Sequence, residues 1–400
     1  MKRIVIFVLL CGAFLVPAKA QDDILNTAGE LLDMFFQYLG AAQIDEIPID
    51  SNRLDSVQWQ STPVGGMKLL KQKNLGDWNI KAGDYSGIVW LGERNFAVVS
   101  DKERTDGYIP FLIDINLDNG NLENVYRFDK VQGNPHPRYG LGGQNTMRDC
   151  EGIAYFPSNN SFFIAGEGDQ RILEYDAHGK PTGRELAVPK QFGIDCIYKN
   201  YGFESLTYSP ENHRFWTTTE SVLKADGEPA GFKNPNSLNV LRIQSFGDDL
   251  KPKEQYAYRM DKCTVKKQND TYAYGVSELL ALPDGRLLVL EREFYVAERY
   301  AGSYVNHRLY VVDPKRSHQI SFATSLKSLP ENQFMEKKLV TEFKTELKIG
   351  KMNLANYEGM CLGPKLNDGR QTVILISDSQ HNYGNSFFHL KDYMRVLIIG

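Results

Sequence analysis

The chain has 400 residues, of which 42% are hydrophobic and 24% charged, with 34 glycines and 17 prolines. This is the composition of a globular protein with ample material for a core, and it excludes collagen-like, disordered and polytopic membrane proteins. Because 46 basic and 50 acidic residues give a formal net charge of −4, the charge argues against a nucleic-acid partner.

The first twenty residues have the pattern of a secretory signal. Lys2-Arg3 precedes an apolar run from Ile4 to Val16, and Ala18-Lys19-Ala20 is an A-x-A cleavage site. A lipoprotein site at Cys11 is the less favoured alternative, because a large residue precedes the cysteine and the apolar run continues past it. We therefore expect an exported protein, periplasmic or secreted, whose mature form begins near Gln21.

The mature chain keeps only four cysteines, at positions 150, 196, 263 and 361. This number leaves room for one disulfide and fits a bacterial envelope protein better than a disulfide scaffold. We expect buried structural roles for Cys196 and Cys361. No later stretch reaches the roughly 18 apolar residues that a membrane span needs.

An amphipathic segment and a polar linker precede the main domain. Residues 24–40 carry apolar side chains at helical spacing and no lysine or arginine, which favours a helix packed on the protein over a membrane-surface helix. We therefore expect a signal peptide at 1–20, a helix and linker at 21–62, and an all-β domain at 63–400.

Five similar hairpins follow along the rest of the chain. Each begins with an apolar strand and continues, after a turn, into a second apolar strand that ends at an acidic residue. The first strands are Tyr85–Leu91, Cys150–Phe156, Phe203–Ser209, Ser277–Pro283 and Tyr357–Gly363.

Such repeats predict a β-propeller of four-stranded blades, because no unit can bury its faces alone and the closed ring protects the strand edges. We detect five blades, with a sixth degenerate blade as the alternative. The last repeat lacks an outer strand, which residues 67–71 could supply to fasten the ring.

The repeats also place acids at regular positions. Because the two strands of a hairpin are antiparallel, the start of the first and the end of the second lie at the same mouth of the channel. The acids at strand starts are Glu151, Glu204, Glu278 and Glu358, and those at hairpin ends are Asp101, Glu167, Glu220, Glu291 and Asp378. In the first repeat, Ser86 or Asp84 takes the place of the glutamate.

So many carboxylates in one funnel raise one another's pKa, so cations are expected there. Calcium is one source, because it accepts six to eight oxygen ligands. Zinc is disfavoured, because the seven histidines show no paired ligand spacing and no CxxC occurs. Basic side chains beside the acids are the other source: Lys102, Arg104, Arg148, Arg171 and Arg292.

A structural explanation competes with the cation site. Each opening glutamate could instead bind backbone N–H groups of the next blade and hold the blades together. For the whole ring we favour a functional site, because clustered acids in a central cleft mark sites more often than scaffolds.

Two histidines are weaker candidates. His381 lies on the loop that leaves a second strand at the same mouth and could touch substrate, although a surface histidine is the commoner explanation. His136 lies in the Pro/Gly-rich loop 133–143, which could arch over the channel.

Several of these motifs resemble the phytase-like domain family described as "esterase-like activity of phytase". The matching segments are Asp149–Tyr155, Gly202–Tyr208, Ser277–Leu282 with Leu287–Arg292, and Asn356–Cys361 with Ile376–Asp378. The resemblance spans residues 67–400 and implies an exported bacterial β-propeller related to phytase-type phosphoesterases. In calcium-dependent propeller phytases, metals bridge phosphate oxygens and activate water.

By this resemblance, the repeated acids would hold calcium, Glu204 and Glu358 would serve catalysis, and Lys102, Arg148 and Arg292 would clamp the phosphate. The first hypothesis is therefore a metal-dependent phosphoesterase that acts, as a monomer, on a small phosphorylated substrate. The alternatives are a carboxylester or lactone hydrolase and a non-catalytic binding propeller.

Overall fold

The computed structural model describes residues 67–101, 106–132, 148–265, 271–298, 300–348, 351–385 and 388–399. The expected signal peptide, the helix at 24–40 and the linker lie outside these residues, as do Lys102, Arg104 and His136. Within the described segments, we find no helix with the length and apolar character needed to cross a membrane.

The described chain is built from five antiparallel sheets, which form the blades of a propeller. Blade 1 contains β3 (Tyr85–Gly92), β4 (Asn95–Ser100), β5 (Gly107–Ile115) and β6 (Leu122–Arg127), and β7 (Val131–Gln132) pairs with β5. Blade 2 contains β8 (Cys150–Phe156), β9 (Ser161–Gly166), β10 (Arg171–Asp176) and β11 (Pro181–Glu185). Blade 3 contains β12 (Thr207–Ser209), β13 (Arg214–Thr217), β14 (Val240–Gly247) and β15 (Pro252–Arg259).

The last two blades carry additional short strands. Blade 4 contains β16 (Tyr272–Ala281), β17 (Leu287–Tyr295), β18 (Tyr304–Val312), β19 (Lys337–Lys348) and β20 (Lys351–Met352). Blade 5 contains β21 (Asn356–Lys365), β22 (Gln371–Asp378), β25 (Tyr393–Ile399) and β1 (Met67–Leu69), and β2 (Lys73–Asn74) also pairs with β25. A separate hairpin joins β23 (Gly384–Asn385) to β24 (Phe388–His389).

Short 3-10 segments lie between these strands. They are Leu75–Trp78, Pro157–Asn159, Lys190–Phe192, Ile194–Cys196, Pro314–Arg316, Leu326–Ser328 and Glu331–Gln333.

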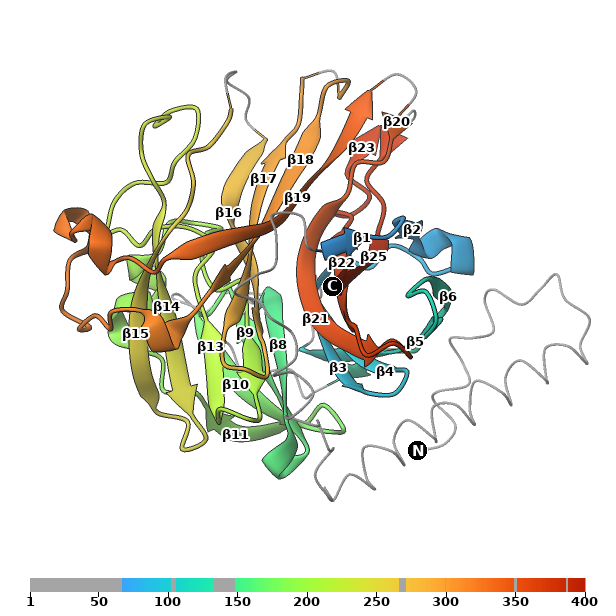
Figure 1. Cartoon of the computed structure of the whole chain (residues 1–400), viewed down its shortest axis with the longest axis horizontal. Helices are drawn as coiled ribbons and strands as arrows, with labels where there is room; N and C mark the ends of the chain where they lie inside the picture. The colour runs from blue at the N-terminus through green and yellow to red at the C-terminus, as the bar shows by residue number, and fades with distance from the viewer. Residues whose placement is uncertain are drawn as a thin grey trace, which may run out of the picture. The chain divides into compact units, whose positions relative to one another are not determined.

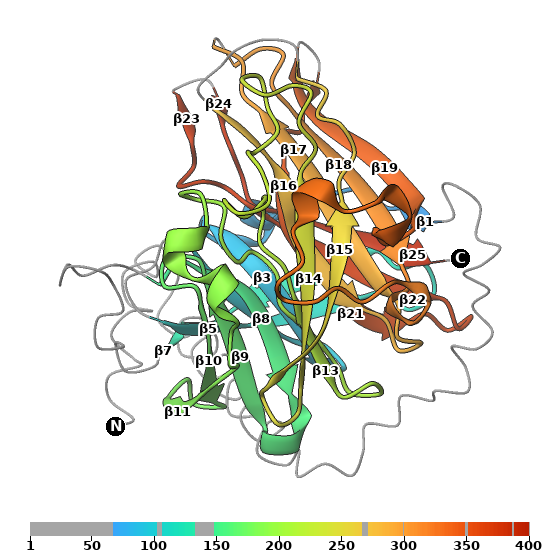
Figure 2. The same ribbon diagram turned by 90° about the vertical axis from the view of Figure 1, so that its left-hand side faces the viewer.

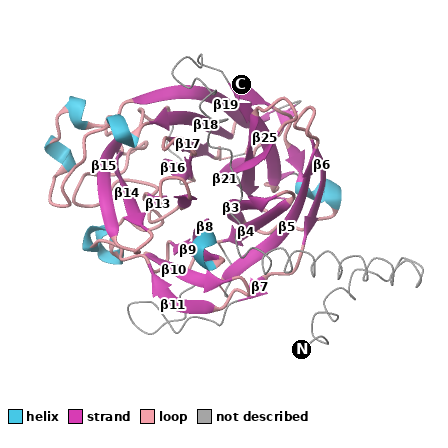
Figure 3. Ribbon diagram, turned by 60° about the horizontal axis from the view of Figure 1, so that its bottom comes forward, coloured by secondary structure: helices cyan, strands magenta, loops and turns pink. Residues whose placement is uncertain are grey.

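The inner strands close into a ring of five. β3 contacts β8, β8 contacts β12, β12 contacts β16, β16 contacts β21, and β21 returns to β3. Figure 3 shows the blades arranged around this centre, with β6, β11, β15 and β19 toward the outside. The predicted all-β propeller is confirmed, and the ring closes with five blades rather than six.

The first described strand completes the last blade. β1 pairs antiparallel with β25, with Met67 opposite Ile399 and Leu69 opposite Leu397. Figure 1 shows blue β1 beside red β25. The predicted closure is confirmed, and it joins the two ends of the described chain in one sheet.

The core lies between neighbouring blades. One cluster joins Leu290 and Leu309 of blade 4 to Leu375 of blade 5, and another joins Phe163 of blade 2 to Phe215 of blade 3. Inner strands are therefore buried on both faces, which explains why they are apolar runs rather than alternating sequences. The cysteines at 150, 196, 263 and 361 are all free thiols; Cys361 is buried and Cys196 half-buried.

Glycines allow the inner strands to approach one another near the centre. A Cβ atom at Gly152 would lie 2.5 Å from the backbone nitrogen of Leu206 in the next blade, and one at Gly359 would collide with the backbone oxygen of Ser86. Since real Cβ atoms do not come so close, these positions require glycine. The Glu-Gly pairs of the sequence repeat thus combine a carboxylate with a close backbone contact.

Blade 4 rises above the others on one side, as Figure 2 shows for β16 to β19. Its extension packs Phe294, Val305 and Leu347 against Leu390, which follows the β23–β24 hairpin. The rings of Tyr300 and Phe388 lie 6.3 Å apart in the same region. An apolar wall therefore connects blade 4 to the hairpin.

Candidate functional site

The inner strands of blades 1, 2, 4 and 5 each contain a β-bulge, and in blade 3 an isolated bridge between Phe203 and Thr219 precedes β12. In blade 5, Tyr357 pairs with Ser377 and Gly359 with Ile376, so Glu358 has no partner in the ladder. A bulge bends the strand and re-aims the extra side chain. The residues that follow the last pair before this irregularity in the five blades are Ser86, Glu151, Glu204, Ser277 and Glu358.

One residue of each second strand faces the residue two positions before the unpaired one. Asp378 pairs with Asn356, and Arg292 pairs with Gly275. In blade 2, the backbone N–H of Glu167 donates to the oxygen of Asp149 at 2.8 Å. The residues at this closing position are Asp101, Glu167, Glu220, Arg292 and Asp378.

The two sets of positions meet at one mouth of the channel. Glu151 of blade 2 interacts electrostatically with Glu358 of blade 5, and Glu204 of blade 3 interacts with both. We call the acidic residues at these positions the ring carboxylates: Asp101, Glu151, Glu167, Glu204, Glu220, Glu358 and Asp378. Each of their side chains belongs to a residue that is at most 9% exposed.

The register of blade 4 differs from the one expected by aligning acids. Ser277, not Glu278, occupies the bulge, and Arg292, not Glu291, occupies the closing position. Because side chains alternate along a strand, a shift of one residue moves a side chain to the other face. Glu278 and Glu291 are therefore not brought to the ring.

Both displaced glutamates have partners of their own. Glu278 accepts a hydrogen bond from the backbone N–H of Leu279 at 3.0 Å, and the N–H groups of Leu206 and Met360 in the adjacent blades also act on it. Glu291 accepts from Lys337 Nζ at 2.6 Å and from Tyr258 Oη at 2.7 Å. Glu278 therefore fits the structural explanation, in which a glutamate binds backbone N–H groups of neighbouring blades and holds the blades together.

Arg292 is the positive charge inside the ring. It is 5% exposed and forms ion pairs with Glu220 of blade 3 and Glu358 of blade 5. Its Nη1 also donates to Asn356 Oδ1 at 3.1 Å, while its buried Nε has no hydrogen-bond partner among the described residues. Arg292 therefore links three blades and neutralises part of the ring.

Arg148 lies within blade 2 and is engaged there. Its Nε donates to Asp169 Oδ2 at 2.8 Å, its Nη1 donates to Tyr175 Oη at 2.9 Å, and its Nη2 donates to the backbone oxygen of Arg171 at 2.8 Å. The structure does not bring this guanidinium to the ring carboxylates. Lys102, the third expected clamp residue, lies outside the described residues.

Burial and mutual repulsion oppose ionisation of the ring. Desolvation, followed by repulsion from neighbouring acids, raises the pKa of Glu151, Glu204 and Asp378 well above their usual values. Desolvation also raises the pKa of Glu220, although Arg292 opposes this shift. Nearby Tyr201, which Glu220 and Glu167 repel when ionised, has its pKa raised by burial to about 12.

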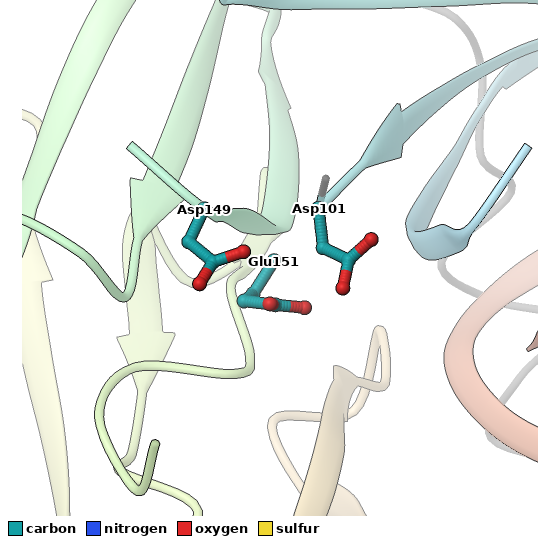
Figure 4. Close-up of side chains that lie close together, drawn as sticks. All are labelled: Asp101, Asp149 and Glu151. Atoms are coloured by element: carbon teal, nitrogen blue, oxygen red, sulfur yellow. The ribbon is translucent and has the colours of Figure 1, made fainter. Parts of the chain in front are cut away.

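Two groups of carboxylate oxygens, from ring carboxylates and from Asp149, lie close enough to share a cation. One oxygen from each of Asp101, Asp149 and Glu151 falls within 4.8 Å of the others, and the same holds for Glu151, Glu167 and Glu204. Figure 4 shows the carboxylates of Asp101 and Asp149 on either side of Glu151. An all-oxygen anionic donor set fits a hard divalent ion such as calcium better than zinc, which favours nitrogen and sulfur ligands.

Asp149 was not identified as a site residue from the sequence. It stands one position before its sequence repeat, as Asp84 and Asn356 stand before theirs, and its φ of 56° places it in the left-handed region. The polar residue one position before the repeat was the available signal, in three of the five repeats.

Comparisons with known proteins agree with this architecture at the level of the family. The family description "Phytase-like: Esterase-like activity of phytase" matches residues 80–381. No curated protein sequence matches the chain.

Several solved structures resemble the chain at low sequence identity. An endo-arabinase from Bacteroides thetaiotaomicron is 10% identical, with 80% of this chain and 95% of that one covered and a TM-score of 0.43. A gluconolactonase from Xanthomonas campestris is 11% identical, with 85% and 92% covered and a TM-score of 0.33. An inactive virginiamycin B lyase from Staphylococcus aureus is 11% identical, with 82% and 99% covered and a TM-score of 0.32.

These TM-scores are low, so the fold assignment rests on the strand pairing and the family on the sequence match. That match covers most of the chain, including every ring carboxylate. The chain belongs to the phytase-like family described by esterase-like activity of phytase.

Proposed function

We propose that the chain is a metal-dependent hydrolase of ester bonds in small molecules, with calcium as its ion and the ring carboxylates as its site. The observation that carries this proposal is the ring itself, in which seven buried carboxylates meet and Arg292 pairs with two of them. The Glu151 and Glu204 side chains form no hydrogen bond or ion pair with the described residues. Buried acids without such partners are costly unless a cation joins them.

Asp101, Asp149, Glu151, Glu167 and Glu204 would hold the ion. A bound divalent ion would supply Lewis-acid chemistry, polarising an ester oxygen and favouring deprotonation of water. The chain's own contribution is positional, because Arg292 fixes Glu220 and Glu358 across three blades.

Phosphate esters are the first substrate class, following the family. A carboxylester or lactone is the second, and one observation favours it. Arg148 is engaged within its blade and Arg292 within the ring, so neither guanidinium is turned wholly toward a ligand. A neutral ester needs no such clamp, whereas a phosphate gains from bidentate arginine contacts.

Hydrolysis of matched esters tests the proposal. We expect the purified protein to hydrolyse p-nitrophenyl phosphate or p-nitrophenyl acetate with calcium, and EGTA to abolish turnover. Glu204→Gln should lower kcat at least 100-fold, while the control Glu336→Gln, at an exposed position, should leave it unchanged. Turnover that neither EGTA nor Glu204→Gln lowers relative to the untreated wild type would remove the ring from the mechanism, and no hydrolysis of any ester would favour a binding propeller.

We also propose that the protein is exported and cleaved after Ala20. The pattern of Lys2-Arg3, the apolar run and the A-x-A site supports this. The mass of the protein recovered from the periplasm or medium should correspond to a chain that begins at Gln21. Recovery of the uncleaved chain in the cytoplasm would contradict it.

A further inference from the structure

The side chains of a histidine and an aspartate form an ion-pair contact at the rim of the ring. His381 Nδ1 lies 2.5 Å from Asp84 Oδ2, and the His381 side chain is 64% exposed. A carboxylate only accepts, so Nδ1 carries the proton in this pair. The other ring nitrogen, Nε2, then holds its lone pair when the imidazole is neutral, and it forms no hydrogen bond with the described residues.

Asp84 holds the histidine by more than its ring. Its Oδ1 accepts hydrogen bonds from the backbone N–H of His381 and, at 3.1 Å, from the hydroxyl of the fully buried Ser379. Asp84 is itself 8% exposed. Backbone and side chain of His381 are therefore fixed by one buried carboxylate.

The turn that carries His381 has an unfavourable backbone. Gln380, His381 and Asn382 have φ values of 49°, 54° and 54°, three successive residues in the left-handed region. Each non-glycine residue there costs roughly 1 kcal/mol. Asp378 and Asp84 accept the N–H groups of Gln380 and His381 and so hold this turn. Strained residues of this kind cluster at functional sites.

The pair adjoins the candidate cation site. The N–H of Asp101 donates to the backbone oxygen of Asp84 at 3.2 Å, and the Asp101 carboxylate belongs to the group with Asp149 and Glu151. Ser86, the position in blade 1 without a carboxylate, lies two residues beyond Asp84. The charge of Asp84 also raises the pKa of three neighbouring groups, namely Asp378, Asp392 and Tyr85.

We propose that His381, oriented by Asp84, is a catalytic proton acceptor and donor for ester hydrolysis at the acidic mouth; this inference rests on the proposed function. Nε2 removes a proton from water while the water oxygen bonds to the electrophilic atom of the ester. The bond from that atom to the leaving oxygen breaks, and the imidazolium returns the proton to that oxygen. Water is added across the ester, and the neutral imidazole is regenerated.

Steady-state kinetics of three variants tests this role with the ester that the wild-type chain hydrolyses. His381→Ala should lower kcat by about 10²–10⁴-fold, with KM changed less than about threefold. The rise of kcat with pH that deprotonation of an imidazole produces should disappear, and added imidazole should restore part of kcat. Asp84→Asn should lower kcat about tenfold or more, because the wrong tautomer is then favoured.

Two controls separate this role from a structural one. His318→Ala, at an exposed position, should keep the wild-type kcat and pH profile. Because substitutions in the turn alter folding, thermal melting should show that His381→Ala is folded. Modification of Nε2 by diethyl pyrocarbonate, read by peptide mass, should be faster at His381 in the wild type than in Asp84→Asn.

The outcomes distinguish the two proposals. If the wild-type chain hydrolyses no ester, the proposed function fails and the role of His381 fails with it. If the wild type is active and His381→Ala keeps a third or more of kcat, only the role of His381 is overturned. A loss of kcat that imidazole does not restore, in a folded variant, also overturns it.

Discussion

Arg292 decides the electrostatics of the ring at the scale of single residues. It is the member of the closing set that carries a positive charge, and it pairs with carboxylates from the two neighbouring blades. Removing one partner from a buried pair leaves uncompensated charge, which costs about 3–5 kcal/mol. Removing Arg292 also leaves the carboxylates at the mouth without one neutralising positive charge, which a bound cation could replace.

We therefore expect Arg292→Met to lower the free energy of unfolding by about 3–5 kcal/mol in chelator. In millimolar calcium this decrease in the free energy of unfolding should be smaller. Arg370→Met is the matched control, because Arg370 pairs with Asp368 on the surface, where side chains are 38% and 50% exposed. That pair should contribute at most about 1 kcal/mol. Equal destabilisation of the two variants, measured by urea unfolding, would contradict this account of Arg292.

A buried histidine lies opposite this arginine on the neighbouring strand and affects how stability depends on pH. His307, opposite Arg292 in the ladder, has its pKa lowered well below the usual value by burial and by the charges of Arg292 and Arg395. It is therefore neutral in the folded state at neutral pH. Its charging on unfolding destabilises the protein in acid, an effect common to all variants that keep it.

At the scale of elements, β1 is a three-residue strand that joins the chain's first described segment to its last. Met67 is 3% exposed and packs in the cluster that contains Leu397 and Ile399. Ring closure thus depends on a short strand whose binding is largely apolar burial.

Met67→Ala should lower the free energy of unfolding by about 2–5 kcal/mol, because it leaves a cavity at the closure. The control Met352→Ala, at a methionine that is 60% exposed, should change it by less than about 0.5 kcal/mol. Urea denaturation curves for both variants provide the comparison. Similar urea midpoints for the two variants would show that β1 does not stabilise the closed ring.

The sequence predicted the blades well because their hairpins are local. Each repeat pairs a strand with the next apolar run, so periodicity and turns were sufficient to find five inner strands and the outer strand at Met67. The blade 4 register was harder, because Ser277-Glu278 and Glu291-Arg292 each contain an acid beside the ring position. Aligning acids selected Glu278 and Glu291, whereas the bulge selects Ser277 and Arg292.

The contacts between individual side chains could not be predicted from the sequence, for a different reason. The partners of Arg148 and Arg292 come from turns and neighbouring blades, namely Asp169, Glu220 and Glu358, and these contacts depend on three-dimensional packing. Asp84 and His381 are 297 residues apart in the chain. No local pattern indicates such a pair.

At the scale of the whole molecule, the ring makes stability depend on pH. The pKa of Glu151, Glu204 and Asp378 is raised in the folded state. In the unfolded chain these acids lose their protons near pH 4, while the folded protein retains them to higher pH. Stability without metal therefore falls as pH rises from about 4 through the raised values, and this loss is complete once both states are ionised.

Glu204→Gln removes one of these ionisations. In chelator it should match the wild type at pH 4.5 and melt about 3 °C or more above it at pH 8. The exposed control Glu336→Gln should melt with the wild type at both pH values. A Glu204→Gln variant that is less stable than the wild type at pH 8 would mean that Glu204 is stabilised by a partner in the folded protein.

Calcium titration followed by thermal melting tests the central claim, a cation site in the acidic mouth, most directly. Protein purified without chelator should contain calcium, and after its removal added calcium should raise Tm saturably, by about 4 °C at a hundred times Kd. Glu151→Gln should lose most of this rise, because Glu151 belongs to both oxygen groups, and Glu336→Gln should retain it. Protein that contains no ion and shows no rise in Tm with calcium would contradict the claim and assign the ring to internal pairing.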